Sequence, residues 1–228
     1  MFNGVTNLGT FEFDGEKYKQ ASNHQKEWGL KLIAESSLEG DEKILDLGCG
    51  DGVLTKQLAD IVPRGKVIGI DASEGMLKAA DKLAATNLSF LLLDINNIDF
   101  KEEFDLIFSN ATLHWVKDHL KLLQKCYFAL KKGGMLRFNF GGAGNCINFS
   151  TIVKKVMQLE RYKKYFADFK WPWYMPSSGE YRQLFGLTNF KNIQVWEQNA
   201  DRFFSSASEL IKWINQPSIV PFIGQIIE

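Results

Sequence analysis

The sequence predicts an α/β fold in which helices cover both faces of a mostly parallel β-sheet. Short apolar runs alternate with helical patterns through the first two thirds of the chain, as crossover connections between parallel strands require. The expected strands are nearly continuous apolar runs, which is typical of strands buried on both faces. With 228 residues, the chain is long enough to bury the core of one large domain.

Five strands are expected in the first part of the chain, at residues 43–47, 67–70, 88–93, 105–108 and 135–140, the last after a turn at 132–134. Helices should run from a glycine loop to about Ile61, from the N-cap Ser73, and over residues 120–130. In the last of these, the residues facing the sheet should be Leu120, Leu123, Tyr127 and Leu130.

The character of the sequence changes after a glycine-rich exit at residues 141–145. We expect a helix over 152–166, an aromatic loop over 171–176 and a sixth strand over 193–197. A last helix should begin near Ser206, which forms a possible capping box with Glu209.

Composition and charge exclude several classes of function. The 27 basic and 27 acidic residues balance, which argues against a nucleic-acid-binding protein. Lysines 154, 155, 163 and 164 are interpreted as the solvated face of a helix. Three scattered cysteines fit neither a disulfide framework nor a metal site, and no apolar run is long enough to span a membrane. The N-terminus lacks the apolar stretch of a signal peptide, so we expect a soluble, cytoplasmic monomer.

The strongest local signal is the segment ILDLGCGDG at residues 44–52. Glycines at the end of a strand allow a tight turn and bring a ligand close to bare backbone. A dinucleotide loop would need GxGxxG or GxGxxA, whereas here the glycines are at 48, 50 and 52 and residue 53 is valine. Asp46 would repel a pyrophosphate but suits a positively charged sulfonium amino acid. We interpret the loop as a site for such a ligand rather than as a purely structural turn.

Two more acidic residues follow strands. Asp71 ends the second strand, where it could accept both hydroxyls of a ribose, although an Asp after a strand is often only a helix cap. Asp94 ends the third strand, where it could accept from an adenine amino group while Ile95 covers the ring. The alternative for Asp94 is a turn-forming residue before two asparagines. The three acids converge on one edge of the expected sheet, where ligands bind in such folds.

Residues 43–140 resemble the class I S-adenosylmethionine methyltransferases, because ILDLGCGDG, VIGIDASEGML, LLLDI, FDLIFSNATLHWV and LKKGGML stand in order. The resemblance implies a Rossmann-like, doubly wound sheet of seven strands, in the order 3-2-1-4-5-7-6 with the last strand antiparallel. It implies S-adenosyl-L-methionine as the cofactor. The residues that it places at the cofactor are Asp46, Gly48, Cys49, Gly50, Asp71, Ala72, Met76, Asp94, Ile95 and Asn110.

A narrower resemblance covers most of the chain. The segment Tyr18-x-x-Ala21-Ser22-x-x-Gln25-x-x-Trp28, the stretch ATLHWVKDH and the tail ELIKWINQPSIVPF are similar to the trans-aconitate methyltransferases. The pair Gln25 and Trp115 is similar to one in carboxyl methyltransferases of small hydrophobic acids, and implies a clamp for the acceptor carboxylate. The tail has no arginine before Pro221, which argues against a tricarboxylate acceptor. The chain stops within an expected helix, so we expect the family's final strand to be missing from it.

These resemblances imply a single domain over residues 1–228, with an N-terminal helical cap (1–42), a cofactor-binding core (43–140) and a substrate-side elaboration (141–228). A carboxylate is ionised at pH 7, so Gln25 and Trp115 would need only to orient it. His114 is a candidate general base or, equally, a histidine whose ring nitrogens are hydrogen-bonded to nearby backbone groups. His24 and His119 are expected on the surface. An acceptor pocket is expected from Tyr18, Trp28, Trp171, Trp173 and Tyr174, although such aromatics also form satellite cores.

The sequence therefore predicts methyl transfer to a small-molecule acceptor, best assigned as the carboxylate of a small organic acid. Two alternatives stay open at this point. One is methylation of a phenol or ring carbon in quinone-type biosynthesis, in which His114 would matter more. The other is a cofactor-binding protein without catalysis. No partner chain, nucleic acid, membrane or metal ion is expected.

Overall fold

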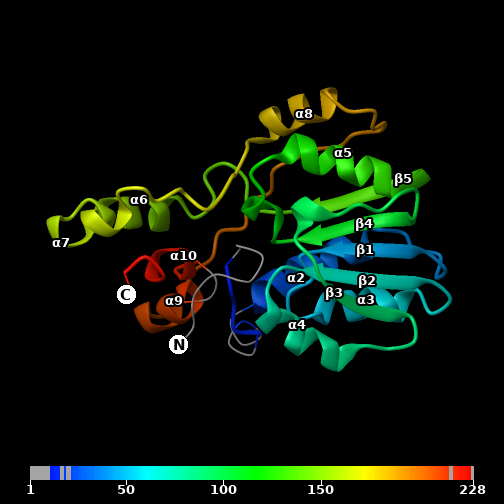
Figure 1. Ribbon diagram of the computed structural model, residues 1–228, viewed down its shortest axis with the longest axis horizontal. Helices are drawn as coiled ribbons and strands as arrows, with labels where there is room; N and C mark the ends of the chain where they lie inside the picture. The colour runs from blue at the N-terminus through cyan, green and yellow to red at the C-terminus, as the bar shows by residue number, and fades with distance from the viewer. Residues whose placement is uncertain (1–10, 16–17, 19–21, 216–217, 227–228) are drawn as a thin grey trace.

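A computed structural model describes residues 11–15, 18, 22–215 and 218–226. Ala21 of the N-terminal motif and Ile227 and Glu228 lie outside the described residues. The described residues form one five-stranded sheet of order β3-β2-β1-β4-β5, in which every neighbouring pair of strands is parallel. Figure 1 shows the sheet at the centre of an α/β body, with helices on both of its faces. The predicted Rossmann-like α/β class is confirmed.

The first five predicted strands are present, with small differences at their ends. The strands are β1 (Lys43–Leu47), β2 (Lys66–Asp71), β3 (Leu88–Leu92), β4 (Phe104–Asn110) and β5 (Leu130–Asn139). β5 begins five residues earlier than expected. Residues 132–134, predicted as a turn before β5, lie inside it, where its pairing with β4 shifts register between Phe104 and Leu106.

Each face of the sheet packs on its own core. One core joins alternate strand residues, such as Ile44 and Phe108, to Leu32 and Leu58 from helices α2 (Asn23–Ala34) and α3 (Val53–Ile61). The opposite core joins Leu45 and Leu47, among others, to helix α5 (His119–Ala129). Because successive strand side chains point to opposite faces, a strand with apolar residues at every position is buried on both sides. This is the doubly wound arrangement that the apolar strand pattern predicted.

Helix α5 faces the sheet with other residues than expected. Its buried positions are His119, Leu122, Leu123, Cys126 and Ala129, whereas Tyr127 is exposed and its ring lies 5.3 Å from that of Phe190. Of the predicted stripe, Leu123 and Leu130 are buried and Leu120 is half-buried, so the prediction is wrong for Tyr127 only. The buried stripe keeps helical spacing but is made partly of small residues, which let the helix approach the sheet closely.

Helix α4 (Glu74–Ala80) follows β2, and the Ser73 hydroxyl accepts from the backbone N–H of Met76, as the N-cap prediction required. The short helices η1 (Asp81–Leu83), η2 (Ile95–Asn97) and η3 (Leu113–Trp115) complete the connections. η2 follows β3 and η3 follows β4, so both lie at the carboxyl edge of the sheet.

The chain after β5 forms helices but adds no strand to the sheet. The predicted helix over 152–166 is instead three pieces, α6 (Ile147–Met157), α7 (Glu160–Lys163) and η4 (Lys164–Phe166). Helix α8 (Ser178–Gly186), with a capping box between Ser177 and Glu180, was not predicted. α9 (Ala207–Ile214) and α10 (Val220–Ile223) end the described chain. Ser206 caps α9 as predicted, but the Glu209 carboxylate returns to Ser205 rather than to Ser206.

The sixth strand predicted over residues 193–197 is wrong. This segment has no strand pairing and is held by side chains: Arg182 donates to the carbonyl of Val195, and the Glu197 carboxylate accepts from the backbone N–H of Ser178. The sheet of the described residues therefore has five strands instead of seven. The predicted order is observed only in its 3-2-1-4-5 part.

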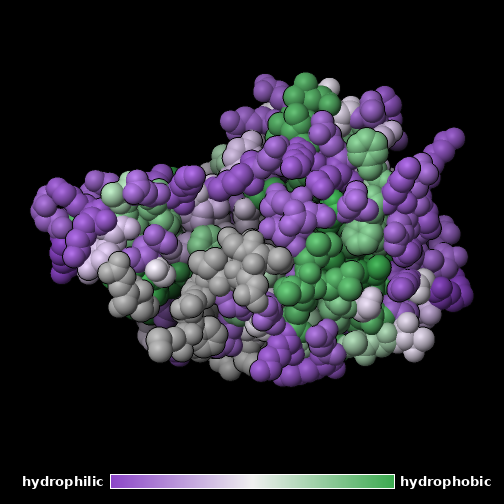
Figure 2. Space-filling view, in the orientation of Figure 1, coloured by the Kyte–Doolittle hydropathy of each residue, from purple (hydrophilic) through white to green (hydrophobic). Residues whose placement is uncertain are grey.

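Figures 1 and 2 show how this second half differs on the outside. Helices α6 and α7 extend away from the sheet as an arm, and the arm is largely hydrophilic. Its lysines 154, 155, 163 and 164 are all exposed, as predicted. Apolar residues gather instead over the edge strand β3, where Leu91 and Leu92 are exposed. No helix in the described part of the chain is long and apolar enough to cross a membrane.

Candidate active site

The glycine loop joins β1 to α3 through backbone angles that only glycine adopts readily. Gly48, Gly50 and Gly52 have φ angles of +72°, +55° and +76°. A Cβ on Gly48 would lie 2.1 Å from the Thr112 side chain, and one on Gly52 would lie 2.9 Å from the Cβ of Ala80. A Cβ on Gly50 would approach only the Tyr18 ring, at 3.8 Å. The first and third glycines are thus needed for packing, and the second leaves bare backbone beside a cavity.

Asp71 ties the glycine loop to the start of α4. One oxygen of its carboxylate accepts from the backbone N–H of Gly50 at 2.9 Å, and the other accepts from that of Ser73 at 2.9 Å. Burial raises the pKa of Asp71 above its ordinary value. The structure therefore places this acid at the predicted end of β2, in a double role as loop brace and helix-entry cap.

Asp46 is buried below the loop. Its carboxylate accepts a 2.7 Å hydrogen bond from the hydroxyl of Thr55, one turn into α3. Burial raises the pKa of Asp46 to about 7, and the nearby charge of Asp71 acts in the same direction. A cation bound beside the loop would relieve this cost by stabilising the ionised carboxylate.

Asp94 lies at the end of β3 but has the turn-forming role that was its alternative. Its Oδ1 accepts from the backbone and the side-chain amide of Asn96, at 2.7 and 2.9 Å, and caps η2. Ile95 and Met76 are buried, at 8% and 4% exposure, and Ala72 is half-buried. The acids at 46, 71 and 94 do lie at the ends of three neighbouring strands of the sheet.

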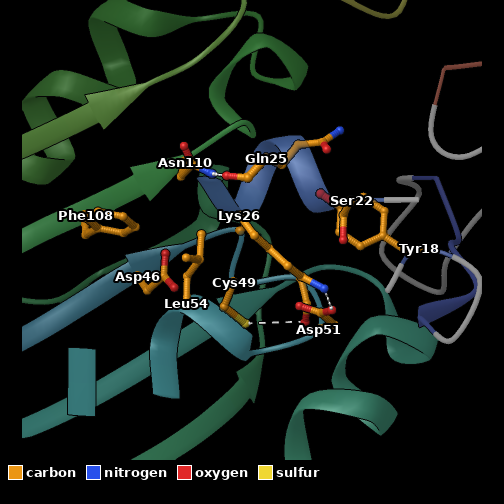
Figure 3. A pocket seen from close by; sticks show the side chains of 12 residues that line it. Tyr18, Ser22, Gln25, Lys26, Asp46, Cys49, Asp51, Leu54, Phe108 and Asn110 are labelled. Atoms are coloured by element: carbon orange, nitrogen blue, oxygen red, sulfur yellow. Dashed lines mark hydrogen bonds and ion pairs between the residues drawn. The ribbon is translucent and has the colours of Figure 1, made fainter. Parts of the chain in front are cut away.

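A cavity opens between the glycine loop, the end of β4 and the N-terminal side of α2 (Figure 3). Seven of the predicted site residues line it: Tyr18, Gln25, Asp46, Gly48, Cys49, Gly50 and Asn110. Five lining residues were not predicted: Ser22, Lys26, Asp51, Leu54 and Phe108. Residues from the N-terminal cap and the core, distant in sequence, therefore share one cavity.

Asn110 fixes α2 against the sheet at this cavity. Its amide donates to the backbone carbonyl of Gln25 at 2.8 Å, and its oxygen accepts from Asn139 of β5 at 2.9 Å. The side-chain oxygen of Gln25 itself is buried without a hydrogen-bond partner among the described residues, as is the hydroxyl of Ser22 one turn earlier. Buried polar atoms normally have hydrogen-bond partners, so these two oxygens mark a place where a bound ligand can provide the missing partners. The N-terminal motif contains both residues, but a site role was predicted only for Gln25.

The cavity is bounded on its N-terminal side by Tyr18 and Lys26. The Lys26 ammonium lies 3.1 Å from the Asp51 carboxylate, and burial next to Asp51 and Asp71 raises the pKa of Tyr18. Further along, the Glu12 carboxylate accepts from the Ser73 hydroxyl and from the backbone N–H of Gly75. Glu12 of the N-terminal cap thus contacts the start of α4. The sequence did not predict this contact of Glu12.

Trp115 lies at the centre of an aromatic cluster beside this edge. Its ring centroid is 5.6 Å from that of Phe11, 5.7 Å from Phe13 and 5.6 Å from Trp173. Its backbone N–H donates to the carbonyl of Thr112, the residue that packs on Gly48. Trp115 is thus linked to the glycine loop through Thr112.

Of the two histidines after β4, His114 has a backbone contact, which was one of its two alternatives, and His119 differs from the prediction. Burial lowers the pKa of His114 to about 4, and its Nδ1 accepts a long contact, at 3.5 Å, from the N–H of Gly141. His119 is only 2% exposed, which makes the surface prediction wrong. Its Nε2 donates to the carbonyl of Leu113 at 2.9 Å, so its Nδ1 accepts from the Tyr181 hydroxyl at 3.1 Å.

The remaining predicted pocket residues divide between the cluster and other contacts. Trp173 is in the cluster, and Trp171 lies behind it, 5.4 Å from the Trp173 ring. Tyr174 donates its backbone N–H to the carbonyl of His114, but its ring packs on His119, away from Trp115. Trp28 lies under the guanidinium of Arg202, which also pairs with Glu27. The structure does not bring Tyr174 or Trp28 into the cavity or the cluster.

The residues present fit a sulfonium nucleoside. Two carboxylates, the buried Asp46 and the half-buried Asp71, favour a positively charged ligand over a phosphate. The bare backbone at Gly50 allows close approach of a ligand, and the ribose-binding role of Asp71 stays a prediction. The described residues that would hold S-adenosylmethionine are thus the loop glycines with Asp46, Asp71 and Ser22.

Comparison with known proteins places the chain in a family. A family model described as a methyltransferase domain matches residues 38–207. The trans-aconitate 2-methyltransferase of Mycobacterium tuberculosis is 28% identical over 215 residues, 92% of this chain and 79% of that protein. The malonyl-[acyl-carrier protein] O-methyltransferase of Acetivibrio thermocellus is 33% identical over 135 residues, 58% of this chain and 48% of that protein.

Among solved structures, phosphoethanolamine N-methyltransferase 2 of Haemonchus contortus matches with a TM-score of 0.62 and 22% identity, over 79% of this chain and 42% of that chain. This similarity shows a shared fold. The family match over most of the chain confirms the enzyme class that the glycine loop predicted, and with it the cofactor. The chain belongs to the methyltransferase domain family and is a class I S-adenosylmethionine-dependent methyltransferase.

Proposed function

We propose that this enzyme methylates the carboxylate oxygen of a small organic acid. The observations that carry the proposal are the position of Gln25 in the cavity and the link between Trp115 and the glycine loop. Gln25 lines the cavity with Gly48 and has an unpartnered side-chain oxygen among the described residues. Trp115 donates its backbone N–H to Thr112, the residue that packs on Gly48. Rotation of the Gln25 amide would direct its N–H donors to the same place.

When bound, S-adenosylmethionine supplies a methyl group on a positively charged sulfur, to which a carboxylate oxygen can bond as the carbon–sulfur bond breaks. The task of the protein is to hold the two reactants in line and in contact. Neutral donors such as an amide and an indole N–H orient a carboxylate without a competing positive charge, so its oxygen stays nucleophilic. These are the donor types that Gln25 and Trp115 provide.

The state of His114 supports a carboxylate acceptor over a phenol. A carboxylic acid with a pKa near ~4 is already ionised at pH 7, so its methylation needs no base. A phenol or a ring carbon would need one, and the pKa of His114, lowered to about 4, makes this imidazole a weak base. Among the two alternatives, methylation in quinone-type biosynthesis is therefore the less supported by the site.

The relatives give independent support. The names of two of them specify trans-aconitate and a malonyl group as acceptors, and both of these carry carboxylates. The acceptor of the present chain is a separate proposal, because these relatives are 28% and 33% identical to it. A small-molecule acceptor, with no nucleic acid and no partner chain, stays a prediction, as does the division into cap, core and elaboration.

The test is turnover of a panel of carboxylic acids, detected as methyl esters, with the variants Gln25→Ala and Trp115→Ala. We expect both variants to bind S-adenosylmethionine within about threefold of the wild type and to lose at least ~100-fold in kcat/KM, since both act on acceptor orientation. Gln57→Ala on the exposed face of α3 and Trp196→Ala, whose side chain is 55% exposed, are matched controls. Undiminished ester formation by both site variants would overturn the proposed clamp.

A further inference from the structure

One buried donor in the aromatic cluster, an indole N–H group, makes no hydrogen bond with the described residues. The Trp173 side chain is 8% exposed, and its indole Nε1 is fully buried with no hydrogen-bond partner in the part of the chain that the structure describes. Indole N–H groups usually find a partner when they are buried, because an unmade hydrogen bond is unfavourable. The orphaned donor therefore requires a reason.

The surroundings of Trp173 are aromatic on several sides. Its ring lies 5.6 Å from that of Trp115, 5.8 Å from Phe222 and 6.3 Å from Phe149. None of these three side chains offers an acceptor oxygen to the Trp173 N–H. An acceptor must therefore come from outside the cluster. Trp115, which is linked to the glycine loop through Thr112, indicates the side where the reacting molecule would lie.

The described residues include a second buried indole N–H group without a hydrogen-bond partner, and its surroundings differ from those of Trp173. Trp213 on α9 also has a buried, unpartnered Nε1, but its ring packs against Phe204 in the tail. It has no contact with β4, the glycine loop or Trp115 among the ring contacts of the described residues. An orphaned indole alone is thus no evidence of a site, and the place beside Trp115 is what distinguishes Trp173.

The cations around the cluster are already engaged. The Lys117 ammonium donates to the backbone carbonyl of Trp171, and the Lys154 ammonium lies 4.7 Å from the centre of the Trp171 ring. Lys26, which lines the cavity, pairs with Asp51, and Arg202 pairs with Glu27. A ligand with several carboxylates would be desolvated here without enough compensating charge.

We propose that the indole N–H of Trp173 is a further hydrogen-bond donor to the acceptor carboxylate, in a cluster that selects apolar acids with a single carboxylate. The inference rests on the proposed function for the nature of the reacting group. Trp173 is a specificity-determining residue in this view: its N–H completes the orientation begun by Trp115, and the surrounding rings bind the apolar part of the acid. Two neutral indole donors again leave the carboxylate nucleophilic.

Trp173→Phe is the discriminating variant, since it keeps an aromatic ring and removes the N–H. Trp171→Phe in the same loop is the matched control, because its indole nitrogen is not among the orphaned buried atoms. The probes are octanoate, an apolar acid with one carboxylate, and trans-aconitate, a tricarboxylate. Each is titrated calorimetrically into enzyme saturated with S-adenosylhomocysteine, and methyl ester formation is measured in parallel with S-adenosylmethionine.

We expect octanoate to bind the wild type more tightly than trans-aconitate does, and Trp173→Phe to weaken octanoate binding about tenfold or more. Trp171→Phe should change it less than twofold, and cofactor affinity should be unchanged in both variants. Equal octanoate binding by Trp173→Phe and wild type would overturn the role of Trp173. Tighter binding of trans-aconitate, or no binding of octanoate, would overturn the acceptor class.

A second measurement does not depend on how well the variant folds. The indole 1H–15N resonance of Trp173 in the wild-type complex should move downfield on addition of octanoate, as a new hydrogen bond forms. An unmoved resonance at saturation contradicts the proposal. Binding that responds to Trp173→Phe without ester formation would refute the proposed reaction while leaving this donor role intact. Ester formation that is insensitive to Trp173→Phe would refute the donor role of Trp173 and leave the proposed reaction intact.

Discussion

The two sides of the active site are built in different ways. The cofactor side consists of backbone: three glycines with positive φ, and carboxylates that accept from backbone N–H groups. The proposed acceptor side consists of side chains from segments far apart in sequence, such as Phe11, Trp115 and Trp173. The first depends on a local stretch of chain, and the second on how several segments pack.

This difference separates binding of the methyl donor from choice of the acceptor. A change in the glycine loop alters the path of the backbone, so it should disturb the cofactor site and the fold together. A change in the aromatic cluster alters the shape and the donors of one wall, so it should change the acceptor and leave the cofactor bound. The following predictions test this separation, from the largest expected effect to the smallest.

Gly48→Ala should have the largest effect. The added Cβ would lie 2.1 Å from Thr112 at a φ of +72°, so both overpacking and backbone strain oppose it. We expect a loss of about 3 kcal/mol in the free energy of unfolding and at least ~100-fold in affinity for S-adenosylmethionine. Thermal unfolding and calorimetric titration measure the two effects.

The control for this prediction is Gly133→Ala in β5. Gly133 also has a positive φ, +86°, but a Cβ there would meet no atom within 4 Å. This variant should lose about 1 kcal/mol in stability and bind the cofactor normally. If Gly133→Ala impaired cofactor binding as much as Gly48→Ala did, the loss could not be assigned to the glycine loop.

Asp71→Asn should have the next largest effect. The amide keeps the shape but loses the charge, and its NH2 group cannot accept from the N–H of Gly50 or Ser73. We expect about 100-fold weaker binding of S-adenosylmethionine, measured by calorimetry. Asp60→Asn on the exposed end of α3 is the control, and equal effects of the two substitutions would contradict the role of Asp71.

The pH dependence of cofactor affinity tests the buried acid Asp46. Its pKa is raised to about 7, so near pH 6 it is largely protonated, and a cationic ligand must be accompanied by loss of that proton. Affinity for S-adenosylmethionine should be constant above pH 8 and should approach a tenfold fall per pH unit below 7. Calorimetric titrations between about pH 5.5 and 8.5, a range centred on the pKa of Asp46, measure the slope of affinity against pH.

Asp46→Asn should flatten this profile, because the variant has no proton to release. The same raised pKa predicts that the wild-type free energy of unfolding decreases as pH rises from about 4 to 7, since the folded state holds the proton more tightly than the unfolded state. A wild-type cofactor affinity that is flat from pH 6 to 8 would be inconsistent with a buried, protonated Asp46.

His114→Gln should have the smallest effect. With a pKa of about 4, His114 is neutral throughout pH 6–8 and is not required as a base for a carboxylate acceptor. We expect kcat to change by less than about threefold and to stay independent of pH in this range. A loss of ~100-fold or more, restored by an external base such as imidazole, would favour a phenol or ring-carbon acceptor instead.

The sequence made the cofactor side predictable because its signals are local. Each of these signals lies within a few residues of sequence: the glycine spacing, the acids at strand ends and the Ser73 cap. The structure places Asp46, Gly48 and Asp71 at the predicted edge of the sheet. Asp94 shows the limit of this reasoning. Its position at the end of the third strand was predictable, but its hydrogen bond with Asn96 is the one expected from the turn-forming alternative.

The acceptor side was less predictable because its contacts are not local. Residues 193–197 have a strand-like pattern, yet no strand of the described sheet pairs with them. Tyr174 and Trp173 are neighbours in sequence, but their rings pack on opposite sides, against His119 and Trp115. Aromatic composition predicted that a cluster exists, and only tertiary packing decides which rings form it.

The central claim is that the glycine loop with Asp46 and Asp71 holds a sulfonium nucleoside. Parallel calorimetric titrations of the wild-type enzyme with S-adenosylmethionine and with NAD test this claim most directly. Saturable heat with S-adenosylmethionine and none with NAD is the result that the site predicts. Binding of NAD without binding of S-adenosylmethionine would contradict it.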